Sequence, residues 1–158
     1  MKINKQDEYG LRLLLRIAKT EDAEGLSIPV LAEQEGLSQP YVAKLTRDLR
    51  IGGLIQSTRG QKGGYILAKS PSSITIKEVI SILGGELFEK DFCGSHAGTA
   101  RLCTNSVDCS VRSLWRVVQH SVDKVLAEIK LEDLMYSEKE TKRTLNEIVM
   151  GIFQHEMV

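Results

Sequence analysis

A β-hairpin with a basic tip is predicted by the stretch Leu54-Ile-Gln-Ser-Thr-Arg-Gly-Gln-Lys-Gly-Gly-Tyr-Ile-Leu-Ala68. Apolar and polar residues alternate in two short runs, residues 54–58 and 65–68, which is the pattern of half-buried strands. The glycine-rich segment between the runs carries Arg59 and Lys62, so the loop that joins the two strands is cationic.

Three helices are expected before this hairpin. Apolar residues recur at helical spacing from Lys5 to Lys19, and they cover nearly the whole circumference of that helix. Serine caps and glycine stops then bound two further helices, residues 28–35 and residues 38–51. Three helices followed by a basic hairpin is the layout of a winged helix-turn-helix domain, so we predict a mainly α fold with a small β-wing.

The rest of the chain predicts further helices. Thr75 to Glu78 reads as a capping box that opens a short helix, and Ser137 to Glu140 opens the last one. Between them, residues 111–129 form a long helix with a coiled-coil-like seam, which we interpret as a dimer helix. The seam consists of Val111, Trp115, Val118, Val122, Val125 and Ile129, widened by Leu114 and Leu126.

We divide the chain into three parts on these patterns. Residues 1–72 form the DNA-binding domain, residues 73–110 a connecting helix and a cysteine loop, and residues 111–158 the dimer helix and the C-terminal helix. The 158 residues are 42% hydrophobic, which is ordinary for a globular protein. The charged N-terminus does not resemble a signal peptide, and no segment approaches the ~20 apolar residues that span a bilayer, so we expect a cytoplasmic protein.

The net charge of zero conceals an uneven distribution. Residues 39–69 hold six cations against the single anion Asp48, a local charge of +5 that is suited to neutralising phosphates. The last 28 residues hold six acids against three bases, so we expect the C-terminal helix to be acidic and solvated.

Residues 38–50 are predicted to form a helix with two different faces. Helical steps of 100° place Val42, Leu45 and Leu49 together and turn Lys44 and Arg47 the opposite way. Such periodicity also fits a solvated helix of any small bundle, but the basic hairpin that follows favours DNA binding in the major groove. The predicted DNA-binding residues are Ser38, Gln39, Pro40, Tyr41, Lys44, Arg47, Arg59 and Lys62, with Arg59 suited to a narrow minor groove.

Three cysteines, Cys93, Cys103 and Cys109, fall within one polar stretch. Structural cysteines usually sit singly among apolar neighbours, and an odd number does not suit a disulfide framework. The thiols therefore look like ligands or redox-active groups. An iron-sulfur cluster, a thiol-only redox switch and a structural zinc site all stay open, although the paired C-x-x-C spacing of common zinc sites is missing.

The order of these motifs resembles the IscR/NsrR family of winged-helix transcription regulators. The hairpin resembles the family's wing, and Ser38-Gln-Pro-Tyr-Val-Ala-Lys-Leu45 its recognition helix. The likeness continues through Ile76-Lys-Glu-Val79 and the cysteine loop into the long helix, so it covers nearly the whole chain. It implies a homodimeric repressor or activator that binds operator DNA and holds a [2Fe-2S] or [4Fe-4S] cluster on three cysteines, which correspond to Cys93, Cys103 and Cys109.

Three cysteines leave one position of a cluster open, because a cluster takes about four protein ligands. One branch of the family has a histidine three residues after the last cysteine, but Arg112 stands there and cannot ligate a metal. Another branch uses an acid from the partner's first helix, and Glu8 resembles it by position, with Asp7 and His96 as alternatives. Glu8 alone would also suit the helix dipole as a first-turn acid. The first two cysteines are further apart here than in the best-known members.

An enzyme, such as a cysteine-dependent oxidoreductase, is the alternative from another functional class. The sequence shows no C-x-x-C, no recognisable nucleophile and base, and no glycine-rich phosphate loop after a strand. A regulator that has lost its cluster and acts through protein contacts is a third possibility. We predict a non-enzymatic regulator in which a change at the cysteines reorders the segment after Glu89 and alters the spacing of the two recognition helices.

Overall fold

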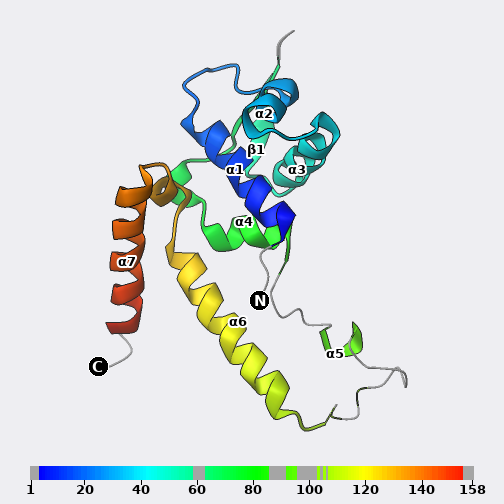
Figure 1. Ribbon diagram of the computed structural model, residues 1–158, viewed down its shortest axis with the longest axis vertical. Coiled ribbons are helices and arrows are strands. Elements are labelled where there is room, and N and C mark those ends of the chain that lie inside the picture. The colour runs from blue at the N-terminus through cyan, green and yellow to red at the C-terminus, as the bar shows by residue number, and fades with distance from the viewer. Residues whose placement is uncertain are drawn as a thin grey trace.

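The computed structural model describes residues 4–58, 63–85, 92–95, 103, 105 and 107–154. A winged-helix domain lies at one end, and α6 extends away from it (Figure 1). The elements, in chain order, are α1 (Lys5–Lys19), α2 (Ile28–Glu35), α3 (Gln39–Ile51), β1 (Ile55–Ser57), β2 (Tyr65–Leu67), η1 (Pro71–Ser73), α4 (Ile76–Leu83), α5 (Phe92–Ser95), α6 (Ser110–Glu128), η2 (Leu131–Leu134) and α7 (Glu138–Gln154). The predicted fold class, mainly helical with a small β-wing, is confirmed.

Local signals account for the ends of the first three helices. Asn4 begins α1 through a capping box, in which the Asp7 amide donates to Asn4 Oδ1 over 2.8 Å. Gly36 ends α2 with a φ of 65°, which glycine adopts without strain. Ser27 and Ser38 stand at the expected N-cap positions, but neither side chain makes a cap hydrogen bond in this described region.

The core of the domain is formed by side chains that are fully withdrawn from water. Each such leucine contributes about 1.5–3 kcal/mol through burial. The fully buried residues include Leu13, Leu14, Leu31, Val42, Leu45, Leu49 and Leu54.

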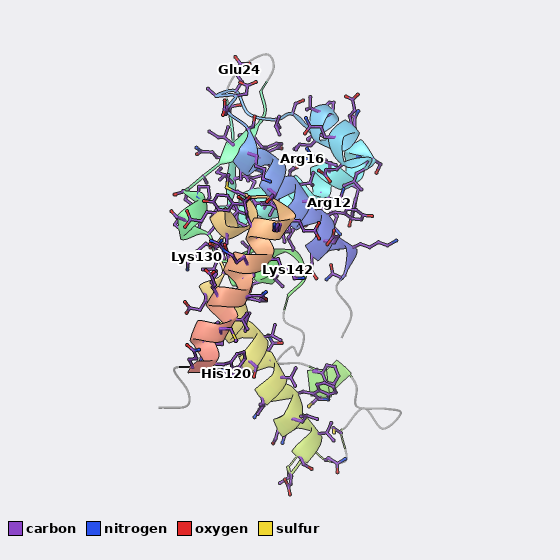
Figure 2. The ribbon with its side chains drawn as sticks, turned by 60° about the vertical axis from the view of Figure 1, so that its left-hand side comes forward. Arg12, Arg16, Glu24, His120, Lys130 and Lys142 are labelled. Atoms are coloured by element: carbon purple, nitrogen blue, oxygen red, sulfur yellow. The ribbon has the colours of Figure 1, made fainter. Side chains whose placement is uncertain are left out.

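A buried carboxylate joins α1 to α2. The Glu35 side chain is only 3% exposed, and it accepts hydrogen bonds from Arg12 Nε over 2.7 Å and from Arg16 Nε over 2.5 Å. Figure 2 shows both arginines on α1. Both arginines are about half-exposed, so water screens these ion pairs on one side, but together they neutralise the buried carboxylate and hold α2 against α1.

The wing has a third partner that the sequence did not predict. Strands β1 and β2 pair antiparallel, with Ile55 opposite Leu67, as expected. Leu26 adds a bridge to Tyr65, with N–H···O distances of 3.1 and 2.9 Å in the two directions. The wing is thereby tied to the segment before α2.

The core continues beyond the hairpin into α4 and η2. Val79 and Leu83 from α4 and Leu131 from η2 belong to the same buried cluster as α1–α3. The Ile76 amide donates to the Ile129 carbonyl over 2.9 Å, which brings the chain after α6 back to the domain. The division drawn at residue 72 follows the order of the predicted elements, whereas the buried core runs across it.

Helix α6 differs from the helices of the domain, since none of its nineteen residues is buried. The expected seam does not face outward along its whole length. Val122 and Leu126 line a small cavity against α4, and Ile129 is buried beside the domain. Helix α7 lies beside α6 and contributes the buried residue Ile152. No helix of the described residues is long and apolar enough to cross a membrane.

Candidate nucleic-acid interface and cysteine site

The recognition helix α3 presents the face that its periodicity predicts. Val42, Leu45 and Leu49 are fully buried, whereas Lys44 and Arg47 are exposed on the outer side. Ser38, Gln39 and Pro40 are exposed at the N-terminal end of the helix, the part of a recognition helix that meets base edges. The two predicted wing residues, Arg59 and Lys62, lie outside the described residues.

Tyr41 stands between the core and the outer face of α3. Its ring makes an edge-to-face contact with Tyr9, with centroids 6.1 Å apart and planes at 85°. The Arg12 guanidinium lies 5.6 Å from the centre of the Tyr9 ring. Such aromatic and cation–π contacts contribute about 0.5–1.5 kcal/mol each. Tyr41 therefore supports the position of α3, beside any contact that it makes with DNA.

Sequence reasoning missed Gln6, which contacts the cationic face of α3. In the amide orientation that satisfies both polar atoms, Oε1 accepts from Lys44 Nζ over 2.8 Å and Nε2 donates to the Leu83 carbonyl over 3.0 Å. A glutamine in a first helical turn carries no signal that would single it out. Its role depends on α3 and α4, which the chain brings to it from 38 and 77 residues further on.

Two of the three cysteines belong to helical segments, and Cys103 lies between them in sequence. Cys93 belongs to the short helix α5, and Cys109 caps α6, where its Sγ accepts from the Arg112 amide over 3.3 Å. All three thiols are free and partly exposed. The described residues contain no group of three His, Cys, Asp or Glu side chains that could hold a metal ion. The donors suit a thiophilic cofactor in chemistry, but this structure does not gather them.

Among the candidates for a fourth ligand, Glu8 is the accessible one. Its side chain is 58% exposed, and Oε1 lies 4.0 Å from Arg12 Nη1. Asp7 is instead turned into the fold, where Oδ2 accepts weakly from the Asn4 amide over 3.4 Å and Oδ1 is buried without a hydrogen-bond partner. Burial raises the pKa of Asp7, and the Asn4 hydrogen bond only partly offsets this. His96 lies outside the described residues.

Gly84 explains why Asp7 is held in place. A Cβ atom at Gly84 would lie 2.1 Å from Asp7 Oδ1, so a side chain at position 84 would displace the Asp7 carboxylate. In the structure this carboxylate is directed towards the end of α4.

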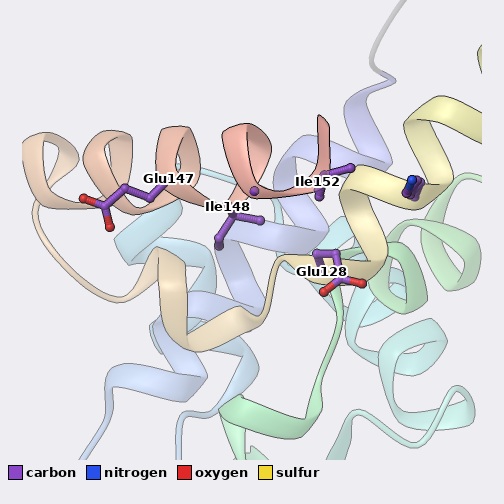
Figure 3. Close-up of a pocket in the computed structure, with 6 residues that line it drawn as sticks. Glu128, Glu147, Ile148 and Ile152 are labelled. Atoms are coloured by element: carbon purple, nitrogen blue, oxygen red, sulfur yellow. The ribbon is translucent and has the colours of Figure 1, made fainter. Parts of the chain in front are cut away.

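The N-terminal half of α6 displays an apolar face. Leu114 is 56% and Trp115 44% exposed, and Val111 and Val117 are exposed as well. An open cleft of about 420 Å³ lies between α6 and α7, with Glu128, Ile148 and Ile152 among its lining residues (Figure 3). Contiguous exposed apolar residues of this kind mark interaction surfaces.

Comparison with known proteins identifies relatives over most of the chain. Residues 3–137 match the Rrf2 family model, described as an iron-dependent transcriptional regulator. The chain is 31% identical to the HTH-type transcriptional regulator CymR of Bacillus subtilis over 134 residues, which cover 85% of this chain and 89% of that protein. It is 30% identical to the HTH-type transcriptional regulator IscR of Escherichia coli over 139 residues, which cover 88% and 83%.

Solved structures agree with the sequence matches. IscR of T. potens superposes with a TM-score of 0.67 at 32% identity, covering 85% of this chain and 86% of that one. The structure of CymR, the global cysteine regulator of B. subtilis, superposes with a TM-score of 0.66 at 31% identity, covering 85% and 96%. The predicted resemblance is thus confirmed, and the chain belongs to the Rrf2 family of winged-helix transcriptional regulators.

Proposed function

We propose that this chain is a homodimeric, sequence-specific DNA-binding regulator that senses iron, redox or nitric oxide status through an iron-sulfur cluster on Cys93, Cys103 and Cys109. One observation carries the proposal: three free, partly exposed thiols lie at and before the N-terminus of α6. The same helix displays exposed apolar residues there. Thiolates are the usual protein ligands of iron-sulfur clusters.

The DNA-reading part of the proposal rests on α3 and the wing. Lys44 and Arg47 project from a helix whose other face is locked into the core, so the chain loses little further freedom on binding a groove. Ser38, Gln39, Pro40 and Tyr41 would lie nearest the bases or their flanking phosphates. Arg59→Ala is expected to weaken operator binding by about 1–3 kcal/mol in a sequence-dependent manner if Arg59 reads a groove. An equal loss on operator and random DNA would reduce Arg59 to a phosphate contact.

The cluster would be held by the three cysteines and, across the dimer, by Glu8 of the second copy. When bound, it would supply redox-sensitive iron and sulfide. Glu8 suits this role because its carboxylate is exposed and paired only loosely with Arg12, whereas Asp7 is enclosed by Gly84. Carboxylates are uncommon but possible iron ligands.

The experiment is purification without oxygen, followed by iron, sulfide and absorbance measurements on the full chain. We expect stoichiometric iron and sulfide in the parent and their loss in Cys103→Ser. Glu8→Ala should shorten the lifetime of the cluster, while Asp7→Asn, which keeps the cap acceptor, should leave it unchanged. A Glu8→Ala protein with the parent's spectrum and lifetime, beside a His96→Ala protein that loses both, would place the fourth ligand in the cysteine loop.

A thiol-based switch without a cluster is the second candidate. The comparison with CymR, named the global cysteine regulator of B. subtilis, favours it. It predicts colourless protein without iron or sulfide, whose operator affinity changes on mild oxidation and returns on reduction. DNA binding that is indifferent to both treatments would exclude either sensor.

A further inference from the structure

The first turn of α1 contacts both the recognition helix α3 and the end of α4, after which the chain continues towards Cys93. Helix α4 ends at Leu83, and Gly84 and Gly85 begin the connection that leads to Cys93. At the other side, α3 carries Lys44 on its exposed face. In the amide orientation that satisfies both of its polar atoms, Gln6 donates to the Leu83 carbonyl over 3.0 Å and accepts from Lys44 Nζ over 2.8 Å.

The packing around Gln6 leaves the two helices little room to move independently. A Cβ atom at Gly10 would lie 2.5 Å from the Leu83 methyl groups, and one at Gly84 would collide with Asp7. Helix α1 therefore contacts α4 at both places with no space for an added methyl group. A displacement of Leu83 would therefore act on α1 at Gly10, because close-packed contacts transmit shifts.

The Gln6 oxygen limits where the Lys44 ammonium can point. A lysine side chain has about 2 kcal/mol of rotamer entropy, and its ammonium has no fixed geometry of its own. The Leu83 carbonyl fixes the Gln6 amide through its nitrogen, and the Gln6 oxygen then favours one arrangement of the Lys44 side chain. The orientation of Lys44, a predicted DNA contact, therefore depends on the position of the Leu83 backbone at the end of α4.

We propose that Gln6 is a positioning residue: it aims Lys44 at DNA and passes the state of the cysteine segment to the recognition helix through Leu83. This inference rests on the proposed function, since it requires both operator binding and a change at the cysteines. Gln6 need touch neither DNA nor the cysteines. It acts by moving the acceptor that holds Lys44.

A double-mutant cycle tests the first half of the inference. The probe is a labelled duplex selected by the parent protein from a random-sequence library, and binding is measured by fluorescence anisotropy on metal-free full-length protein. Gln6→Met, which has a similar shape and no hydrogen bond, should weaken binding about 3- to 10-fold, the range of one net hydrogen bond. In a Lys44→Ala background the same change should matter by less than about twofold.

Two further variants serve as controls for the double-mutant cycle. Gln6→Met combined with Arg47→Ala, one turn further along α3, should be additive and serves as the matched control. Gln6→Asn replaces Gln6→Met in the cycle if the Gln6→Met protein folds poorly. Its side chain keeps the amide but is one methylene too short to reach both partners, so it should weaken binding to the same extent. Full additivity of the Gln6 and Lys44 changes in folded protein would overturn the proposal.

The response ratio, operator affinity with the cluster divided by affinity without it, tests the second half. Gln6→Met should bring this ratio towards one, while Arg47→Ala should leave it at the parent value. A parent ratio different from one that is unchanged in Gln6→Met overturns the inference alone. A parent ratio of one overturns the proposed sensor, and the coupling through Gln6 with it, whereas failure of the parent to select any duplex overturns the DNA-binding function itself.

Discussion

The winged-helix domain buries its apolar residues, whereas helix α6 leaves apolar residues exposed. The domain encloses Leu13, Leu45 and Leu54 completely, whereas α6 has no buried residue and exposes Leu114 and Trp115 at its N-terminal half. One chain therefore completes the part that reads DNA. Helix α6, which Cys109 caps, leaves apolar residues exposed in the single chain, and exposed apolar residues of this kind mark interaction surfaces.

Truncating one leucine in each region should give the largest contrast. Leu45→Ala removes a fully buried side chain from α3 and should cost about 2–5 kcal/mol of unfolding free energy. Leu114→Ala removes a side chain that is 56% exposed and should change the stability of the dissociated chain by less than about 0.5 kcal/mol. Urea unfolding followed by circular dichroism at low protein concentration measures both. Similar losses would mean that α6 is covered within the single chain.

A charge on the exposed face of α6 should break association without unfolding the domain. Leu114→Asp places a carboxylate where we expect the partner's apolar surface, and an unpaired charge at a buried contact costs several kcal/mol. Leu114 is a better site than Val122, because Val122 faces α4 and a charge there would also disturb the chain itself. Sedimentation velocity should show a monomer for Leu114→Asp and a dimer for the control Ser72→Asp, on the exposed surface of η1. A dimeric Leu114→Asp protein would place the interface elsewhere.

The salt dependence of DNA affinity should show the contribution of the positive charge on the recognition helix. Arg47→Ala is expected to weaken binding of operator and random DNA to similar extents and to lower the slope of log affinity against log salt by about 1. Arg143→Ala removes the same charge from α7, where it pairs with Glu147 over 3.4 Å, and should change neither quantity. An Arg47 effect confined to one operator position would make it a base contact.

The smallest effect concerns the junction between the two regions. Burial raises the folded-state pKa of Asp7, so the folded state holds the proton more tightly than the unfolded chain does. This contribution to stability is complete below the unfolded value, about 3.9, and is lost as pH rises through the folded value. The melting temperature of Asp7→Asn minus that of the parent should therefore increase as the pH rises from acidic to neutral. A difference that stays constant with pH would show that Asp7 does not titrate in this way.

The sequence predicted what depends on neighbouring residues. Apolar periodicity placed the bounds of α1 correctly, serines and glycines placed those of α2 and α3, and the capping box at Ser137 forms as expected, with the Ser137 amide donating to Glu140 over 3.1 Å. At Thr75 only half of the predicted box forms: Thr75 Oγ1 accepts from the Glu78 amide, while the Glu78 carboxylate pairs with Lys69 Nζ over 2.7 Å.

Contacts between distant parts of the chain could not be predicted in the same way. The bridge from Leu26 to Tyr65, the return of Leu131 to the core and the bonds of Gln6 all join residues far apart in sequence. For the same reason the spacing of the seam residues does not indicate that α4 covers the C-terminal part of α6. The four-residue helix α5 is too short for periodicity to reveal.

We propose that the DNA-reading part is complete within one chain, while the sensing part is completed by a second copy and a cluster. Hydrogen exchange of the full chain, compared with and without cluster in the absence of oxygen, tests it most directly. We predict equal protection of the α2 and α3 amides in both states, with protection gained on cluster binding at residues 92–95 and in the N-terminal half of α6. Loss of protection throughout α2 and α3 in cluster-free protein, with α6 unchanged, would contradict the claim.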